Sequence, residues 1–185
     1  MAAFLAHPPS IADMSDPVTA PGPVTVRVAT PSDLAAMAAI YDEQVRTSVA
    51  TFDTEERGAA YLGEKLAATG PGDVVLVACL DEEVVGYAFS GPFRPRPAYA
   101  GTKEVFVYVH ASVCGRGVAR SLYAALLARL DAEPSVHTQL AVIAQPNEAS
   151  EALHVAFGFE RVGVLREVGN KFGRWVDTVW YQRLA

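Results

Sequence analysis

The stretch Glu104-Val-Phe-Val-Tyr-Val-His110, followed by Ala-Ser-Val-Cys114-Gly-Arg-Gly-Val-Ala-Arg120, decides how this chain folds. β-Branched and aromatic residues predict a strand over residues 103–110, and the glycines that follow predict a tight turn. Apolar residues recur at helical spacing from Ser121 to Ala132, so a helix follows the turn. Such a turn leaves backbone N–H groups free at the positive end of the helix dipole. Glycine lets an anion approach these groups closely, and Arg116 and Arg120 add positive charge, which makes the turn a candidate phosphate site.

This turn differs from two common phosphate-binding motifs. Val118-Ala119-Arg120 follows Gly117, so the turn is not the dinucleotide fingerprint G-x-G-x-x-G, and it lacks the Gly-Lys-Ser/Thr of a P-loop. A tight strand-to-helix connection with solvated arginines explains the same residues. The turn alone therefore leaves a binding role and a purely structural role equally open.

The composition of the whole chain is that of one globular domain. Its 185 residues are 51% hydrophobic and 19% charged, which excludes a disordered or collagen-like chain. Fifteen Lys and Arg against 21 Asp and Glu give a net charge of −6, which argues against sequence-independent nucleic-acid binding. The longest apolar run, Leu34 to Tyr41, is far shorter than the roughly 20 residues of a membrane-spanning helix. We therefore expect no nucleic-acid partner, no membrane segment and no need for a structural metal.

The cysteines and the N-terminal residues predict a cytoplasmic protein with a leader. Two cysteines, Cys79 and Cys114, fit a reducing compartment. A signal peptide begins with positively charged residues, and this chain has no Lys or Arg before Arg27. Residues 1–24 hold five of the 12 prolines and no lasting apolar period, so we expect a flexible leader there, with a docking or swapped arm as the alternative. Residues 25–185 then form one domain.

The remaining periodicities predict strands and helices in the order βααβββαβαββ. Strands are expected over 25–29, 74–80, 84–90, 103–110, 138–143, 162–166 and 175–181. A first helix is expected to start at residues 30–33, and three more are expected over 55–68, 121–132 and 147–157. Strands interleaved with helices predict an α/β (α+β) fold with a mixed sheet flanked by helices. The last two strands are expected to form a hairpin.

A second group of residues lies one helix and one strand beyond the glycine turn. Asn147 starts a helix, His154 follows two turns later on the same face, and Gly158-Phe159 ends it. Taken separately, Asn147 is a typical helix cap and His154 a typical structural histidine. Because they lie one helix and one strand beyond the glycine turn, both residues are candidates for lining a single cleft together with that turn.

Together these motifs resemble those of the GNAT N-acetyltransferases over about residues 25 to 183. Cys114-Gly-Arg-Gly-Val-Ala119 is similar to their acetyl-CoA signature Gln/Arg-x-x-Gly-x-Gly/Ala, and Asn147…His154…Gly158-Phe159 is similar to their Asn…Tyr…Gly-Phe segment. The likeness extends to the phosphinothricin and methionine sulfoximine N-acetyltransferase branch. The residues that carry it are Arg46-Thr-Ser-Val-Ala-Thr-Phe52, Ser90-Gly-Pro-Phe-Arg94, Ala98-Tyr99, Glu104, Tyr108-Val109, His154 and Lys171-Phe-Gly-Arg-Trp175. The resemblance implies a GNAT-like, mostly antiparallel sheet and an acyltransferase that uses acetyl-CoA.

The resemblance also implies which residues bind acetyl-CoA. They are Val107, Tyr108, Val109, Gly115, Arg116, Gly117, Val118, Ala119 and Arg120, together with Asn147, which resembles the residue that binds the CoA arm. Cys114 stands where the signature has Gln or Arg, so we expect that pyrophosphate contact to be missing or to move to Arg116 or Arg120. His154 stands where most GNAT enzymes have Tyr. The phosphinothricin branch also has His at this position, so this difference favours the resemblance to that branch.

The same resemblance implies catalytic roles. Glu104 matches the family's catalytic carboxylate and is the candidate general base for the acceptor ammonium, directly or through a water. Alternation along the strand puts Glu104 on the same face as Phe106 and Tyr108, and burial beside them would raise the pKa of Glu104. The structural alternative is that Glu104 forms an ion pair with Lys103 or with an arginine of residues 94–96. His154 is the candidate acid for the CoA thiolate or an orienter of the substrate. A backbone N–H of the strand Val107–Val109 is the candidate oxyanion donor.

The branch acetylates small amino-acid analogues such as phosphinothricin and methionine sulfoximine or sulfone, and the resemblance implies such a small-molecule amine here. Arg94 and Arg96 suit its carboxylate or phosphinate group, and Phe52 and Tyr99 suit the apolar sides of the pocket. Residues 171–175 are expected to close the site, from a partner subunit if the chain is a homodimer as branch members are. Two alternatives stay open: a GNAT enzyme acting on another amine (a protein N-terminus, a polyamine or an antibiotic), and a non-catalytic acyl-CoA sensor.

Overall fold

The computed structural model describes residues 22–185, so the leader predicted at 1–24 lies outside the described residues except for its last three. The strands are β1 (Thr25–Val28), β2 (Val74–Leu80), β3 (Glu83–Pro92), β4 (Thr102–Val109), β5 (Thr138–Ala144), β6 (Glu160–Lys171) and β7 (Arg174–Leu184). The helices are α1 (Leu34–Thr47), α2 (Gly58–Ala67), α3 (Val118–Asp131) and α4 (Glu148–Ala156), with short 3-10 turns at Pro31–Asp33, Pro97–Tyr99 and Ala111–Val113. Their order, βααβββαβαββ, is the predicted one.

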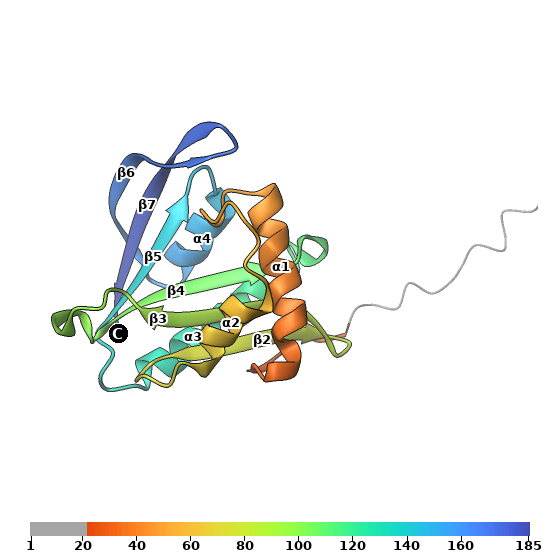
Figure 1. Cartoon of the computed structure of the whole chain (residues 1–185). Helices are drawn as coiled ribbons and strands as arrows, with labels where there is room; N and C mark the ends of the chain where they lie inside the picture. Colours follow the sequence, from red (N-terminus) through yellow and green to blue (C-terminus); the bar gives the residue numbers. More distant parts are fainter. Residues whose placement is uncertain (1–21) are drawn as a thin grey trace, which may run out of the picture.

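The seven strands form one sheet in the order β1-β2-β3-β4-β5-β7-β6 (Figure 1). Neighbouring strands are antiparallel except β4 and β5, which run parallel. A parallel pair needs a crossover connection, which α3 provides. The predicted mixed, mostly antiparallel sheet is therefore confirmed, and β6 and β7 form the predicted hairpin.

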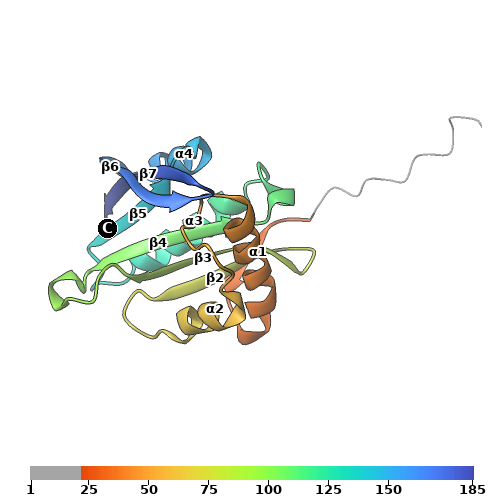
Figure 2. The same cartoon turned by 45° about the horizontal axis from the view of Figure 1, so that its top comes forward.

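Helices cover both faces of the sheet (Figures 1 and 2). On one face, α1 and α2 bury Met37, Ile40 and Leu62 against β2 and β3. On the other face, α3 buries Leu122 and Leu126, and α4 packs on the same core. None of the helices in residues 22–185 is long and apolar enough to cross a membrane.

Some predicted boundaries are wrong, for local physical reasons. α2 starts at Gly58 rather than at residue 55, because the Asp42 carboxylate accepts hydrogen bonds from the Arg57 and Gly58 N–H groups at 3.0 and 3.4 Å. α3 starts three residues before the predicted residue 121, because Gly117, with a φ of 79°, turns the chain directly into the helix. β6 and β7 run beyond 162–166 and 175–181 because they pair with each other as far as the turn between them.

The parallel contact between β4 and β5 is short, and this opens the sheet. The two strands pair only from Thr102 and Thr138 to Glu104 and Leu140. Beyond that point they diverge, although β4 stays paired with β3 and β5 stays paired with β7. The result is a V-shaped gap in the middle of the sheet.

Candidate active site

Three cavities lie in series through the gap between β4 and β5. A cleft of about 430 Å³ lies beside α3 and α4, a constriction of about 60 Å³ lies within the gap, and a pocket of about 180 Å³ lies beside α1 and α2. Tyr108 lines all three. The cleft shares Val107, Asn147 and Ser150 with the constriction, and the constriction shares Ala50, Phe106, Val142 and Ala144 with the pocket. The three cavities therefore adjoin one another in a row from one face of the sheet to the other, and we call this row the passage.

The predicted cofactor residues gather on the wall of the cleft. Nine of the ten line it: Val107, Tyr108, Val109, Gly115, Gly117, Val118, Ala119, Arg120 and Asn147. The exception is Arg116, whose side chain is exposed on the turn. Cys114 also lines the cleft, without adding a positive charge to it.

The glycine turn presents free backbone donors to this cleft. Gly115 and Gly117 have φ of 78° and 79°, and a Cβ at either would meet nothing within 4 Å, so the space before the turn is open. The first backbone bond of α3 runs from the Ser121 N–H to the Gly117 carbonyl. Within residues 22–185, the N–H groups of residues 117–120 have no hydrogen-bond partner, which suits a phosphate at the start of a helix. These donors fit the diphosphate of a CoA ligand.

The gap also exposes backbone donors of β4. The His110 N–H donates to the Val85 carbonyl at 2.9 Å, so the even-numbered residues of β4 bond to β3 and the odd-numbered ones face the other way. The N–H groups of Val107 and Val109 therefore point toward the gap that β5 leaves open. The motif predicts an oxyanion donor in this strand, but nothing in the sequence predicts the divergence from β5 that leaves these N–H groups unpaired.

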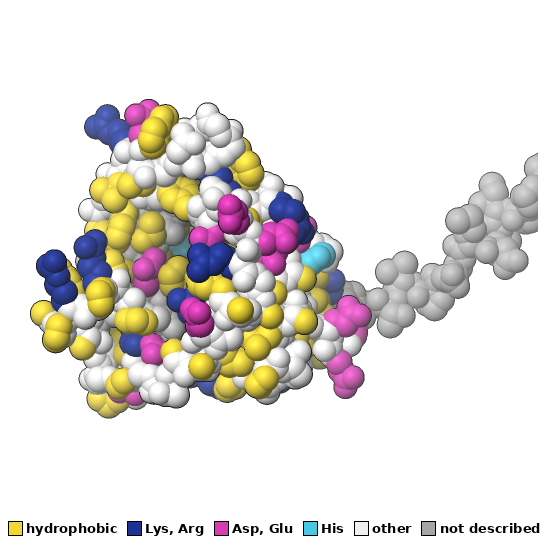
Figure 3. All heavy atoms as spheres, viewed as in Figure 1, with side chains coloured by type: hydrophobic (Ala, Val, Ile, Leu, Met, Phe, Trp, Pro, Cys, Tyr) yellow, Lys and Arg dark blue, Asp and Glu magenta, His cyan; other side chains and the backbone are white. Residues whose placement is uncertain are grey.

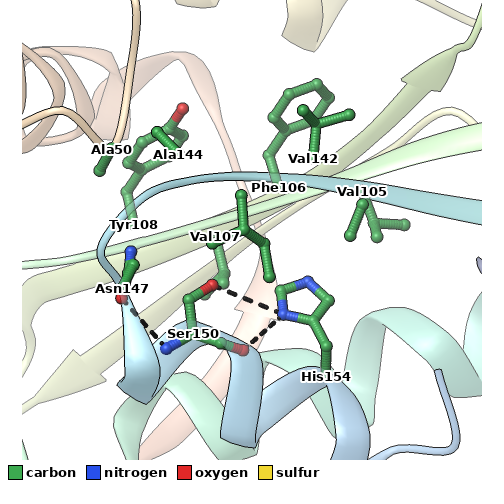
Figure 4. Close-up of a pocket in the computed structure, with 12 residues that line it drawn as sticks. Ala50, Val105, Phe106, Val107, Tyr108, Val142, Ala144, Asn147, Ser150 and His154 are labelled. Atoms are coloured by element: carbon green, nitrogen blue, oxygen red, sulfur yellow. Dashed lines mark hydrogen bonds between the residues drawn. The ribbon is translucent and has the colours of Figure 1, made fainter. Parts of the chain in front are cut away.

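His154 lies beside the constriction with one ring nitrogen already bonded (Figure 4). It is 4% exposed, and its Nδ1 lies 2.7 Å from the Ser150 carbonyl oxygen. A carbonyl only accepts, so Nδ1 carries the proton, and the neutral ring leaves Nε2 as an acceptor. Burial lowers the pKa of His154 against the opposing effect of that hydrogen bond, which favours the neutral ring.

Asn147 is the N-cap residue of α4, as its position in the sequence predicts. Its Oδ1 accepts a hydrogen bond from the Ser150 N–H at 3.1 Å. The amide group also lines both the cleft and the constriction. Because capping uses only the oxygen, the side-chain NH₂ is left for a ligand.

The pocket on the α1 and α2 side is lined by aromatic rings and hydroxyl groups. Tyr41, Tyr61 and Tyr108 contribute to it, and the rings of Tyr41 and Tyr108 meet edge-on with 5.2 Å between centroids. Figure 3 shows a hollow on this face of the molecule, with hydrophobic atoms around it and acidic and basic groups at its rim. Of the four residues predicted to contact the acceptor, Phe52 lines this pocket and the other three do not, and because of Phe52 we call it the acceptor-side pocket.

Comparison with known proteins identifies the family. Residues 26–180 match the family model described as an acetyltransferase (GNAT) domain. The chain belongs to the GNAT acetyltransferase family. It is 44% identical over 167 residues to a phosphinothricin N-acetyltransferase of Streptomyces coelicolor, which covers 86% of this chain and 95% of that protein. It is 36% identical to an L-methionine sulfoximine/L-methionine sulfone acetyltransferase of Pseudomonas paraeruginosa, over 85% of this chain and 92% of that one.

A solved structure shares the fold and the cofactor. The crystal structure of a GNAT superfamily phosphinothricin acetyltransferase from Sinorhizobium meliloti, in complex with acetyl-CoA, superposes with a TM-score of 0.83. It is 34% identical and covers 87% of this chain and 88% of that one. The predictions of a GNAT fold, an acyltransferase and acetyl-CoA as cosubstrate are confirmed.

In this GNAT fold, Glu104 lies at the start of β4 without an ion-pair partner among residues 22–185. The alternative of a pair with Lys103 is wrong, because the Lys103 ammonium binds the Asp73 carboxylate at 2.6 Å. Burial raises the pKa of Glu104, and the charge of Lys65 partly offsets this. Phe106, the next residue on the same face of the strand, lines the acceptor-side pocket.

Arg94, Arg96 and Tyr99 lie in the loop between β3 and β4, beside the acceptor-side pocket and outside its lining. Tyr99 packs edge-on against Phe93, with 5.5 Å between ring centroids, and Phe93 packs against Trp180 at 6.1 Å. Trp180 is the cross-strand neighbour of Val142, which lines the pocket. The loop is therefore anchored next to the pocket by aromatic contacts.

A polar network behind the acceptor-side pocket was not predicted from the sequence. The Tyr41 hydroxyl donates to the Asp53 carboxylate at 2.7 Å and lies 2.7 Å from the Thr51 hydroxyl. The Lys171 ammonium donates to the Thr51 carbonyl at 2.8 Å, although the two residues are 120 positions apart. No local pattern links these residues, since Tyr41 carries only a helical apolar signal.

Proposed function

We propose that this enzyme acetylates the α-amine of a small amino-acid analogue such as phosphinothricin or methionine sulfoximine or sulfone. The names of the relatives at 36–44% identity support this class of acceptor. The observation that carries the proposal is the passage, the row of adjoining cavities in the β4–β5 gap. It lets a cosubstrate on one face of the sheet and a small amine on the other meet at the constriction.

The cleft beside α3 and α4 is the proposed site of acetyl-CoA, which supplies the acetyl group as a thioester. The free N–H groups of residues 117–120 bind the diphosphate, and Arg120 adds positive charge at the same helix start. Asn147 donates its side-chain N–H to the CoA arm. The contact that Gln or Arg makes in the family signature falls here to Arg116 or Arg120, since Cys114 has no positive charge.

Glu104 is the proposed general base. The acceptor ammonium must lose a proton before its nitrogen lone pair can attack the thioester carbon. The raised pKa of Glu104 makes its carboxylate a better proton acceptor near neutral pH. The proton passes to it directly or through one water, while Arg94 and Arg96 attract the anionic groups of the acceptor from the adjacent loop.

The gap supplies the remaining groups. The N–H groups of Val107 and Val109 stabilise negative charge on the thioester oxygen during the attack. Of the two roles considered for His154, orientation is the better supported, because its neutral ring accepts at Nε2 and has no proton there to give. His154 then orients a bound group or water within the constriction.

A thiol-release assay with acetyl-CoA tests the proposed function. The panel contains phosphinothricin, methionine sulfoximine, methionine sulfone, spermidine, an aminoglycoside and a peptide with a free N-terminus. We expect kcat/KM to be at least tenfold higher for the amino-acid analogues. A higher value for spermidine, the aminoglycoside or the peptide would replace the acceptor class, and tight CoA binding without thiol release would favour a sensor.

We also propose that the enzyme is a homodimer, formed through the β6–β7 hairpin. β6 is an edge strand, and the hairpin exposes a row of large apolar side chains: Val162, Val164, Leu165, Val168, Phe172 and Trp175. An uncovered apolar edge strand is a surface on which a second chain can pair. Light scattering should give the mass of two chains, and a monomer at micromolar concentration would contradict the proposal. A cytoplasmic location is proposed because Cys79 and Cys114 are both free thiols.

A further inference from the structure

The tip of the β6–β7 hairpin holds a buried lysine that has no part in the chemistry proposed above. Lys171 is 3% exposed, and its Nζ donates to the Thr51 carbonyl at 2.8 Å and lies 5.1 Å from the centroid of the Phe172 ring. Taking an ammonium out of water is costly unless it gains a partner. Burial accordingly lowers the pKa of Lys171, and the Asp53 carboxylate opposes this effect. The hydrogen bond to Thr51 and the nearby charge of Asp53 therefore both compensate for burying this ammonium.

That bond reaches the wall of the acceptor-side pocket. Thr51 and Phe52 line the pocket and belong to the segment between α1 and α2. From the α1 side, the Tyr41 hydroxyl holds this segment through Thr51 and Asp53. Lys171 holds it from β6, so the wall is fixed both to a helix and to the hairpin.

Gly169 makes a second contact between the same two segments. A Cβ at this position would overlap the ring of Phe52. The Phe52 ring therefore rests directly on the backbone of β6, which a residue with a side chain would prevent. The hairpin thus fits Phe52 by shape and Thr51 by a hydrogen bond.

We propose that Lys171 and Gly169 are positioning residues that set the affinity for the acceptor by holding the Thr51–Phe52 wall in place. They act without touching the acceptor or acetyl-CoA. The acetyl-CoA cleft shares none of these four residues, so the hairpin affects acceptor binding and leaves cosubstrate binding unchanged. This inference rests on the proposed function for the nature of the acceptor.

Four variants test the proposal. Lys171→Met keeps much of the side-chain length and loses the donor, Lys171→Arg keeps a donor, and Gly169→Ala sets a methyl group against Phe52. Arg129→Met is the control, since it removes an exposed cation from α3. With the best acceptor of the panel, Lys171→Met and Gly169→Ala should raise KM at least tenfold while kcat changes less than threefold. The Kd for acetyl-CoA should stay within twofold, Lys171→Arg should recover part of the loss, and the control should match the wild type.

Hydrogen exchange tests the contact without any acceptor. The amides of residues 50–53 should exchange at least tenfold faster in Lys171→Met than in the wild type, with those of α3 unchanged. Unchanged KM and exchange would overturn the proposal. A parallel rise in KM and in the Kd for acetyl-CoA would also overturn it, because the fold as a whole would then be affected. If the wild type acetylates none of the analogues, the proposed function fails, whereas the exchange result still decides the positioning role.

Discussion

The two ends of the passage through the sheet are built in different ways. The acetyl-CoA cleft presents backbone N–H groups of the turn at residues 115–120, and neighbours in the sequence determine them. The acceptor-side pocket presents aromatic side chains, and its Thr51–Phe52 wall depends on Lys171, 120 residues from Thr51. A site made of backbone depends on local conformation, whereas a site made of side chains depends on tertiary contacts. The cleft should therefore tolerate many side-chain changes, and the pocket should tolerate few.

Glu104→Gln should have the largest effect and should act only on the chemistry. Gln keeps the shape of Glu and cannot accept the proton, so kcat should fall by about 10²- to 10⁴-fold. The Kd for acetyl-CoA, measured by calorimetry, should change less than twofold. Glu64→Gln on the exposed side of α2 is the matched control and should leave kcat unchanged. A kcat within threefold of the wild type in Glu104→Gln would remove Glu104 from the mechanism.

Gly117→Val should weaken the cosubstrate end alone. A β-branched residue at a φ of 79° costs about 1–2 kcal/mol, so the start of α3 should shift. We expect the Kd for acetyl-CoA to rise roughly tenfold. Arg116→Ala, which leaves the backbone intact, should raise Kd less than threefold because the side chain is exposed. A larger loss in Arg116→Ala would show that side-chain charge, and not backbone, holds the cosubstrate.

Lys65→Met should shift the pH dependence of the acceptor end without a large loss of rate. Burial raises the pKa of Glu104 and the positive charge of Lys65 lowers it, so removing that charge raises the pKa further. Only the carboxylate accepts a proton, so kcat/KM rises with pH through this pKa. The acidic limb of the profile should therefore move to higher pH in Lys65→Met and stay in place in Lys65→Arg. A limb that stays in place in both variants would mean that it does not report Glu104.

The local features of the fold and site could be predicted from the sequence. The glycine turn and the cap at Asn147 are encoded by adjacent residues, and their predicted positions agree with the structure. The start of α2 could not be predicted, because Asp42 of another helix determines it. Arg94 and Arg96 were assigned to the acceptor pocket from their charge, and their loop is anchored beside the pocket by the contact of Phe93 with Trp180.

The gap between β4 and β5 was the feature hardest to predict. It arises because their pairing stops after Glu104 and Leu140, and nothing in the residues of either strand marks that point. Which residues line the passage follows from this divergence. Motifs in the sequence could therefore predict which residues take part in the reaction. That these residues lie together around the gap depends on the tertiary structure.

An NMR titration of ¹⁵N-labelled enzyme tests most directly whether the two substrates approach from opposite faces of the sheet. On addition of acetyl-CoA, the amides of Gly117, Val118 and Ala119 and those of Val107 and Val109 should shift. The amides of Phe52 and Tyr61 should shift only when an acceptor analogue is added. Shifts at Phe52 and Tyr61 with acetyl-CoA alone, and none at residues 117–119, would contradict the account.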